Sequence, residues 1–166
     1  MESINLGMRE ASQSDVPFLR EMLYQSLYVP DGCVPFDPNI LTRPEIAKYV
    51  EAWGRPGDLS FIALDTNINR SVGAAWLRLF PECDKGYGYV SDTTPELGMA
   101  VLPAYRGRGV GFALLQRLIE AASVLYDTVS LSVSTDNPAL RLYTRVGFER
   151  VGICGNSVTM LKRLKS

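Results

Sequence analysis

The sequence predicts an α/β (α+β) fold with a sheet of about seven strands, and three observations lead to it. Seven short segments carry strand patterns and four longer segments carry helical periodicity. One strand, helix and strand run in succession over 96–134, the spacing of a crossover that joins two parallel neighbouring strands. No repeat, low-complexity tract or linker interrupts the 166 residues, so we expect a single domain over 1–166.

The strand pattern is clearest where apolar residues alternate, as Val129, Leu131 and Val133 do. The helical pattern is clearest where apolar residues recur every three or four positions. The expected strands are 4–10, 59–65, 71–80, 96–102, 128–134, 148–153 and 157–164, and the expected helices are 15–28, 44–53, 109–125 and 138–146. The long loops 29–42 and 81–94 remain, and such loops often carry function.

Proline, glycine and asparagine mark the expected helix ends. Pro44 suits the first turn of the second helix, and Gly54 follows its last residue. Asn137 can cap the fourth helix, with Pro138 at its first position and Gly147 just after its end. In the third helix we expect Ala113, Leu114, Leu118, Ala121, Ala122 and Leu125 to form the core face.

Charge and cysteine usage exclude several classes of partner. A net charge of −1 and a pI near 5.5 argue against nucleic acid or an anionic membrane as the main partner. The three cysteines are widely spaced and odd in number, which favours free thiols in a reducing compartment. The chain has no signal-peptide pattern and no apolar run of about 20 residues. We therefore expect a cytoplasmic protein.

Histidine is absent from the sequence. Its absence removes serine and cysteine mechanisms that need a histidine base, and zinc sites that need histidine ligands. Proton transfer must then rely on carboxylate, tyrosine, lysine, cysteine, backbone or water. No metal is expected.

A basic, glycine-rich turn follows the expected strand 96–102. It reads Arg-Gly-Arg-Gly-Val-Gly over 106–111 and leads into the third helix. Free N–H groups at a helix N-terminus attract anions, phosphate above all, and arginines strengthen such a site. Phe112 stands where a dinucleotide fingerprint needs glycine, and the Gly-Lys-Ser/Thr of a P-loop is missing.

Two motifs in this order resemble those of the GNAT (GCN5-related) N-acetyltransferase superfamily. The first is Arg/Gln-x-x-Gly-x-Gly/Ala, matched by Arg106, Gly109 and Gly111. The second is a run matched by Asn137, Ala139, Leu142, Tyr143, Gly147 and Phe148. The resemblance covers nearly the whole chain and is weakest over 29–56. It implies a mixed, mostly antiparallel sheet with a splayed parallel pair and helices on both faces.

The resemblance also implies acetyl-CoA as the acyl donor. In the family the glycine-rich turn binds the pyrophosphate, and the pantetheine arm pairs with backbone exposed where the parallel strands splay. Carried over to this sequence, the cofactor residues are Met99, Ala100, Val101, Arg106, Gly107, Arg108, Gly109, Val110, Gly111, Asn137 and Tyr143. The Met99 N–H corresponds to an oxyanion donor. Tyr143 corresponds to the tyrosine that protonates the leaving thiolate, and a buried core tyrosine is the alternative interpretation.

Glu96 is the candidate catalytic base, with Asp92 as a second choice. A lysine-type amine has a pKa near 10.4 and must lose a proton before it attacks, whereas an ordinary glutamate has a pKa of about 4.3. Glu96 would need desolvation or a water relay to serve. A solvated strand end is the alternative interpretation.

Three aromatic residues, Tyr28, Phe36 and Tyr89, are candidates for acceptor binding because their loops flank the acceptor site in this family. Acidic residues lie near them in the sequence, a combination that suits an amine cation. We expect acetyl transfer to a primary amine, with a small molecule as acceptor, by direct attack in a ternary complex. Another acyl-CoA donor and a non-catalytic acyl-CoA sensor remain alternatives, and the resemblance allows a homodimer.

Overall fold

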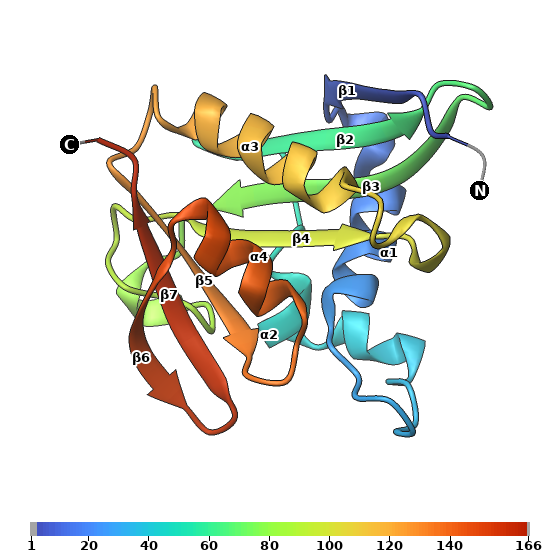
Figure 1. The fold of residues 1–166 in the computed structure, drawn as a ribbon. Coiled ribbons are helices and arrows are strands. Elements are labelled where there is room, and N and C mark those ends of the chain that lie inside the picture. The colour runs from blue at the N-terminus through green and yellow to red at the C-terminus, as the bar shows by residue number, and fades with distance from the viewer. Residues whose placement is uncertain (1–2, 166) are drawn as a thin grey trace.

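A computed structural model describes residues 3–165 and contains one seven-stranded mixed sheet (Figure 1). The strands are β1 (Leu6–Glu10), β2 (Leu59–Asp65), β3 (Arg70–Arg78), β4 (Glu96–Val101), β5 (Thr128–Ser134), β6 (Glu149–Cys154) and β7 (Ser157–Arg163). Their order in the sheet is β1-β2-β3-β4-β5-β7-β6. Only β4 and β5 pair in parallel among these neighbours. The expected fold class is confirmed.

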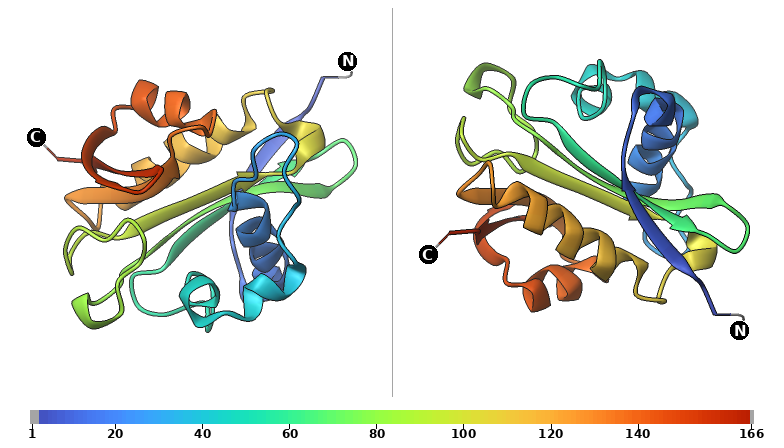
Figure 2. Two further views of the ribbon diagram at one scale, coloured as in Figure 1. Left: turned by 90° about the horizontal axis from the view of Figure 1, so that it is seen from below. Right: turned by 90° about the horizontal axis from the view of Figure 1, so that it is seen from above.

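Helices cover both faces of the sheet. They are α1 (Val16–Ser26), α2 (Pro44–Ala47), α3 (Val110–Ala122) and α4 (Ala139–Val146). Figure 2 shows α1 and α2 on one face and α3 and α4 on the other. The strands between these layers are consequently buried on both sides, as the fully buried Phe61, Trp76 and Leu131 illustrate.

The helix α2 ends at Ala47, six residues before the expected end at 53. The guanidinium of Arg78 on β3 lies beneath this segment. It donates to the carbonyl oxygens of Lys48 at 2.8 Å and Glu51 at 2.6 Å. Both carbonyls belong to the turns that follow α2, and buried carbonyls outside a helix or sheet need such donors. The segment therefore continues as turns that carry apolar residues into the core, although it is no longer a helix.

The helix α3 also ends earlier than expected, at Ala122 rather than 125. Leu125, which the periodicity placed in the core, is 58% exposed. The chain leaves the helix through turns, and the Tyr126 hydroxyl donates to the Gly57 carbonyl at 2.7 Å. This contact holds the chain before it enters β5.

The strands β4 and β5 start together and then diverge, as Figure 1 shows. Their only register pair is Glu96↔Ser130, where the Ser130 N–H donates to the Pro95 carbonyl at 3.0 Å. Beyond this pair the two strands separate, so the splayed parallel pair that the resemblance implies is present.

The sheet ends at β6, a strand whose every residue is exposed. Its register against β7 shifts between Arg150 and Gly152, which leaves Val151 as an extra, unpaired residue. Val151 and Ile153 are 53% and 79% exposed. The edge strand is therefore apolar in part and irregular in its backbone.

Candidate active site

The glycine-rich turn lies at the N-terminus of α3, where the sequence predicts it. Gly107 and Gly109 have φ angles of 73° and 83°, and Gly109 is the N-cap of α3. These left-handed conformations are readily adopted only by glycine. A Cβ added to either residue would meet nothing within 4 Å. The turn is thus open beside a helix N-terminus, which fits a phosphate group.

The two arginines of this turn make contacts within the protein. Arg106 Nε donates to the Val101 carbonyl at 2.9 Å, and its guanidinium reaches Gln25 on α1 at 3.3 Å. The Arg108 guanidinium lies over the Tyr105 ring, 5.4 Å from its centroid. Arg106 therefore holds the turn against β4, and the backbone N–H groups at the start of α3 remain the predicted donors for an anion.

Backbone groups of β4 face the side on which β5 diverges. The Leu102 N–H donates to the Val72 carbonyl at 2.8 Å, and hydrogen-bonded pairs alternate along an antiparallel ladder. The ladder therefore uses the backbone of Ala100 and turns that of Met99 and Val101 toward β5. Within residues 3–165 no strand pairs with the N–H groups of Met99 and Val101. This backbone can pair with an extended ligand.

Glu96 is buried, with 3% of its surface exposed, so a solvated strand end is the wrong interpretation. It lies on the first residue of β4, opposite Arg78 in the ladder with β3. The Gly88 N–H and the Tyr49 hydroxyl both hydrogen-bond to its carboxylate. Burial raises the pKa of Glu96 to about 7, although these hydrogen bonds and the charge of Lys48 act in the opposite direction. Glu96 is thus a much stronger base than an exposed glutamate.

Two further polar side chains lie on the same face as Glu96. Ser130 pairs with Glu96 across the parallel bridge, and Trp76 pairs with Gly98 in the adjoining ladder. Their Oγ and Nε1 atoms are buried and find no hydrogen-bond partner among residues 3–165. Such groups are normally satisfied by water or by a ligand.

Tyr143 lies on α4, 7% exposed, with its ring edge-on to Phe148 at a centroid distance of 5.8 Å. Burial raises its pKa to about 12, so the hydroxyl keeps its proton at neutral pH. Asn137 Oδ1 accepts the Ala139 N–H at 2.9 Å, but α4 begins at Ala139 and its N-cap is Pro138, one residue later than expected. The contacts of Asn137 and Tyr143 with a cofactor stay predictions.

The residues expected at the acceptor site lie in two separate loops. The Tyr24 hydroxyl on α1 donates to the Phe36 carbonyl at 2.5 Å, which ties that loop to the end of α1 near Tyr28. Tyr89 belongs to the other loop, where its hydroxyl donates to Asp92 at 2.5 Å. Asp92 raises the pKa of Tyr89 to about 12, chiefly through this hydrogen bond. The second-choice base Asp92 is therefore committed to Tyr89.

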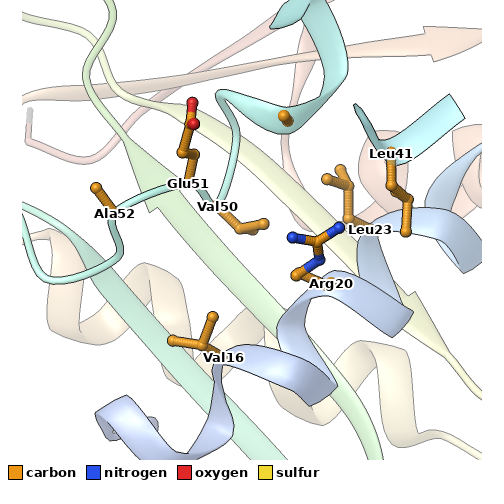
Figure 3. A pocket seen from close by; sticks show the side chains of 8 residues that line it. Val16, Arg20, Leu23, Leu41, Val50, Glu51 and Ala52 are labelled. Carbon is orange, nitrogen blue, oxygen red and sulfur yellow. The ribbon is translucent and has the colours of Figure 1, made fainter. Parts of the chain in front are cut away.

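A hollow of about 150 Å³ lies elsewhere, between α1 and the 44–52 segment (Figure 3). Val16, Arg20, Leu23, Leu41, Ala47, Val50, Glu51 and Ala52 line it. None of the predicted site residues is among them. In the part of the chain that the structure describes, no helix is long and apolar enough to cross a membrane. The same part holds no cluster of three or more metal-ligating side chains.

Sequence reasoning missed the surroundings of Glu96. Tyr49 lies within the expected helix 44–53, and Gly86 and Gly88 lie within the expected loop 81–94, but none of the three was predicted to be a site residue. The one available signal was the Gly-Tyr-Gly-Tyr run of 86–89. Two glycines so close together mark a place where backbone approaches another group closely.

Comparison with known proteins agrees with this architecture. The sequence model of the acetyltransferase (GNAT) family matches residues 21–148. An uncharacterized protein, ML0378, of Mycobacterium leprae is 52% identical over 56 residues, which is 33% of this chain and 15% of that protein. The N-alpha-acetyltransferase RimI of Mycobacterium tuberculosis is 50% identical over 58 residues, 33% of this chain and 34% of that protein. The matches thus span about a third or less of these relatives.

Solved structures share the fold over nearly the full chain. The structure of yncA, a putative acetyltransferase from Salmonella typhimurium with its cofactor acetyl-CoA, superposes with a TM-score of 0.68. It is 21% identical, and the match covers 98% of this chain and 95% of that one. At this identity the likeness concerns the fold, whereas the family match covers most of the sequence. The chain belongs to the GNAT family of acetyltransferases.

Proposed function

We propose that the protein is an N-acetyltransferase that moves the acetyl group of acetyl-CoA to a primary amine by direct attack. The observation that carries this proposal is a buried glutamate, Glu96, whose pKa of about 7 suits a general base at neutral pH. It lies on β4, whose free backbone groups face the side on which β5 diverges. Bound acetyl-CoA would supply an activated acetyl thioester.

The glycine-rich turn and β4 would hold the donor. The N–H groups of 107–111 bind the pyrophosphate at the start of α3, and the backbone of Met99 and Val101 pairs with the extended arm. The Met99 N–H then donates to the thioester carbonyl oxygen as negative charge develops on it. Both roles need donors that are free of the ladder with β3, as those of Met99 and Val101 are.

Glu96 would accept a proton from the amine, and Tyr143 would donate one to the leaving group. Glu96 removes a proton from the ammonium form of the acceptor, through a water because only 3% of Glu96 is exposed. Ser130 lies opposite Glu96 in the parallel bridge, and its buried Oγ, which has no partner among residues 3–165, can hydrogen-bond that water. The neutral amine forms the new C–N bond as the C–S bond breaks, and the Tyr143 hydroxyl gives its proton to the leaving sulfur. The nitrogen loses its second proton as the amide forms, and Tyr143 regains a proton in its place. The proton taken up by Glu96 leaves to solvent, so each turnover releases one proton.

The acceptor class follows from the two loops at 28–37 and 81–93. Phe36 is 43% exposed, and Tyr89 lies beside the carboxylate of Asp92. Aromatic faces with nearby carboxylates favour an organic cation, and the proposed acceptor is a small primary amine. One relative is named as an N-alpha-acetyltransferase, so a peptide N-terminus is the natural competitor to test.

Release of free thiol from acetyl-CoA with a panel of polyamines, aminoglycosides and short peptides tests the function. Turnover with small amines is expected, with kcat/KM rising through a midpoint near pH 7. Glu96→Gln should lower kcat/KM by about 10²–10⁴ and abolish its rise with pH. The exposed control Glu149→Gln should leave both kcat/KM and its pH dependence unchanged. Tyr143→Phe should lower kcat more than the affinity for CoA.

Tight acetyl-CoA binding without turnover on any amine would instead indicate a sensor. Turnover with only a longer acyl-CoA would mean that the donor is not acetyl-CoA.

The proposed binding of the pyrophosphate by the glycine-rich turn can be tested separately. Gly109→Val should weaken CoA binding at least tenfold, because a side chain enters the open space at the start of α3. Gly155→Val is the matched control, since Gly155 also has a positive φ of 58° and open space around its Cα, but lies in the β6–β7 hairpin. Calorimetric affinities that fall equally in both variants would contradict the assignment.

A further inference from the structure

Glu96 is held by groups from two segments that neither GNAT motif contains. We propose that Tyr49 is a positioning residue for Glu96: its hydroxyl, together with the Gly88 N–H, fixes the carboxylate in place as a proton acceptor. This inference rests on the proposed role of Glu96. Under this proposal, the 44–52 segment and the 86–88 turn contribute residues to the active site.

The direction of the hydrogen bonds determines what Tyr49 does. The Tyr87 N–H donates to the Tyr49 hydroxyl oxygen at 2.8 Å. A hydroxyl has one proton to give, and with its oxygen accepting from Tyr87 that proton goes to Glu96. Burial, followed by the nearby carboxylate, raises the pKa of Tyr49 above its usual range, so the proton stays on the hydroxyl. Tyr49 is a fixed donor that favours the carboxylate form of Glu96.

The 86–88 turn approaches too closely for side chains at its glycines. A Cβ on Gly86 would lie 2.8 Å from Glu96 Oε2 and 2.9 Å from the Tyr49 hydroxyl. A Cβ on Gly88 would lie 2.7 Å from Glu96 Oε1 and 2.6 Å from the Leu131 carbonyl carbon on β5. The turn therefore closes over the carboxylate at the point where β4 and β5 begin to diverge.

The ring of Tyr49 is itself held in place. It packs edge-on against Phe80 at a centroid distance of 5.0 Å and an interplanar angle of 64°. The carbonyl oxygens of Lys48 and Glu51, on either side of it, accept hydrogen bonds from the buried Arg78. The Tyr49 ring and the backbone on either side of it are thus both held, which gives the hydroxyl a defined position.

The charged groups around Glu96 are largely committed to other partners. Lys48 Nζ is 3.0 Å from Asp84 and acts on Glu96 through space. Arg78, opposite Glu96 in the ladder, forms an ion pair of 2.7 Å with Asp58. The contacts made directly with the carboxylate are the neutral Tyr49 hydroxyl and Gly88 N–H. Removing the Tyr49 hydroxyl should therefore change the titration of Glu96 directly.

Tyr49→Phe tests the inference, because it deletes the hydroxyl and retains the ring contact with Phe80. The matched control is Tyr126→Phe, which deletes a hydroxyl bonded to the Gly57 carbonyl on another part of the molecule. The readout is the carboxyl titration of Glu96, followed by NMR on protein labelled with ¹³C at the glutamate carboxyls and assigned with Glu96→Gln. Tyr49→Phe should move the Glu96 midpoint to higher pH, and Tyr126→Phe should not.

The acid limb of kcat/KM should move in the same direction, and kcat/KM at pH 6.5 should fall about tenfold in Tyr49→Phe. An unchanged Glu96 midpoint in Tyr49→Phe overturns the inference, as does an equal shift in Tyr126→Phe. The titration needs no substrate, so it decides the role of Tyr49 even if every amine fails. Absence of turnover in the parent protein, by contrast, would count against the proposed function alone.

Discussion

Asp58 and Glu96 carry two buried carboxylates on the α2 side of the sheet. The side chain of Asp58 is 3% exposed, and Glu96 as a whole residue is also 3% exposed. Asp58 is paired with a cation, because Arg78 donates to it through Nε at 3.1 Å and through a terminal nitrogen at 2.7 Å. Glu96 is held by two neutral donors, and burial raises its pKa to about 7. The two carboxylates therefore differ in their partners: Asp58 faces a guanidinium, whereas Glu96 faces neutral donors and has a raised pKa.

The difference separates a structural carboxylate from a reactive one. The Asp58–Arg78 pair also supplies donors to the carbonyls that end α2, so its charge is part of the framework. Glu96 remains without such neutralisation, which is a typical arrangement for catalytic groups. The following changes test this contrast.

Arg78→Met should have the largest effect on stability. It leaves Asp58 buried without its cation and the carbonyls of Lys48 and Glu51 without donors, and such a loss costs about 3–5 kcal/mol of unfolding free energy. Urea denaturation at pH 7 measures it. The double variant Arg78→Met with Asp58→Leu should regain part of the loss. A loss below about 1 kcal/mol for Arg78→Met would mean that the pair is not part of the framework.

Glu96→Gln should change stability in a pH-dependent way. Between pH 4.5 and 7 the native Glu96 binds a proton that the unfolded chain has released, so the parent loses stability as pH rises through this window. The variant lacks this loss. Its unfolding free energy relative to the parent should therefore be a few kcal/mol higher at pH 8 than at pH 4. Denaturation curves at the two pH values give the difference, and parallel behaviour would show that Glu96 titrates normally.

Arg9→Met should have the smallest effect and the opposite pH dependence. Its partner Asp15 lies 2.7 Å away, and the hydrogen bond from Arg9 is the main cause that lowers the pKa of Asp15 to about 2. The stability from this pair is present above about pH 4 and is lost as pH falls toward 2. Arg9 is 43% exposed, so the loss at pH 7 should be about 1 kcal/mol. Arg70→Met, at an exposed position, is the control, and an equal loss there would remove any special role for Arg9.

The parts of the fold that could be predicted are those whose pattern is local. β5 spans Thr128–Ser134, as its alternation predicts, and the glycine-rich turn opens α3 as its composition predicts. The turns that follow α2 could not be predicted, because their carbonyls are bonded by Arg78, thirty residues away from Lys48 in the sequence. The same holds for Glu96, whose burial depends on a glycine turn that is close only in the folded chain. Local patterns thus predicted the glycine-rich turn at the start of α3, whereas tertiary contacts determine the surroundings of Glu96, the proposed base.

The irregular edge strand β6 has a consequence for solubility. A regular, exposed and apolar edge offers its unpaired N–H and C=O groups to strands of other molecules, which promotes aggregation. In β6 the extra residue Val151 interrupts that row of backbone groups next to the exposed Ile153. We therefore expect the bulge to disfavour strand addition at the most apolar part of the edge.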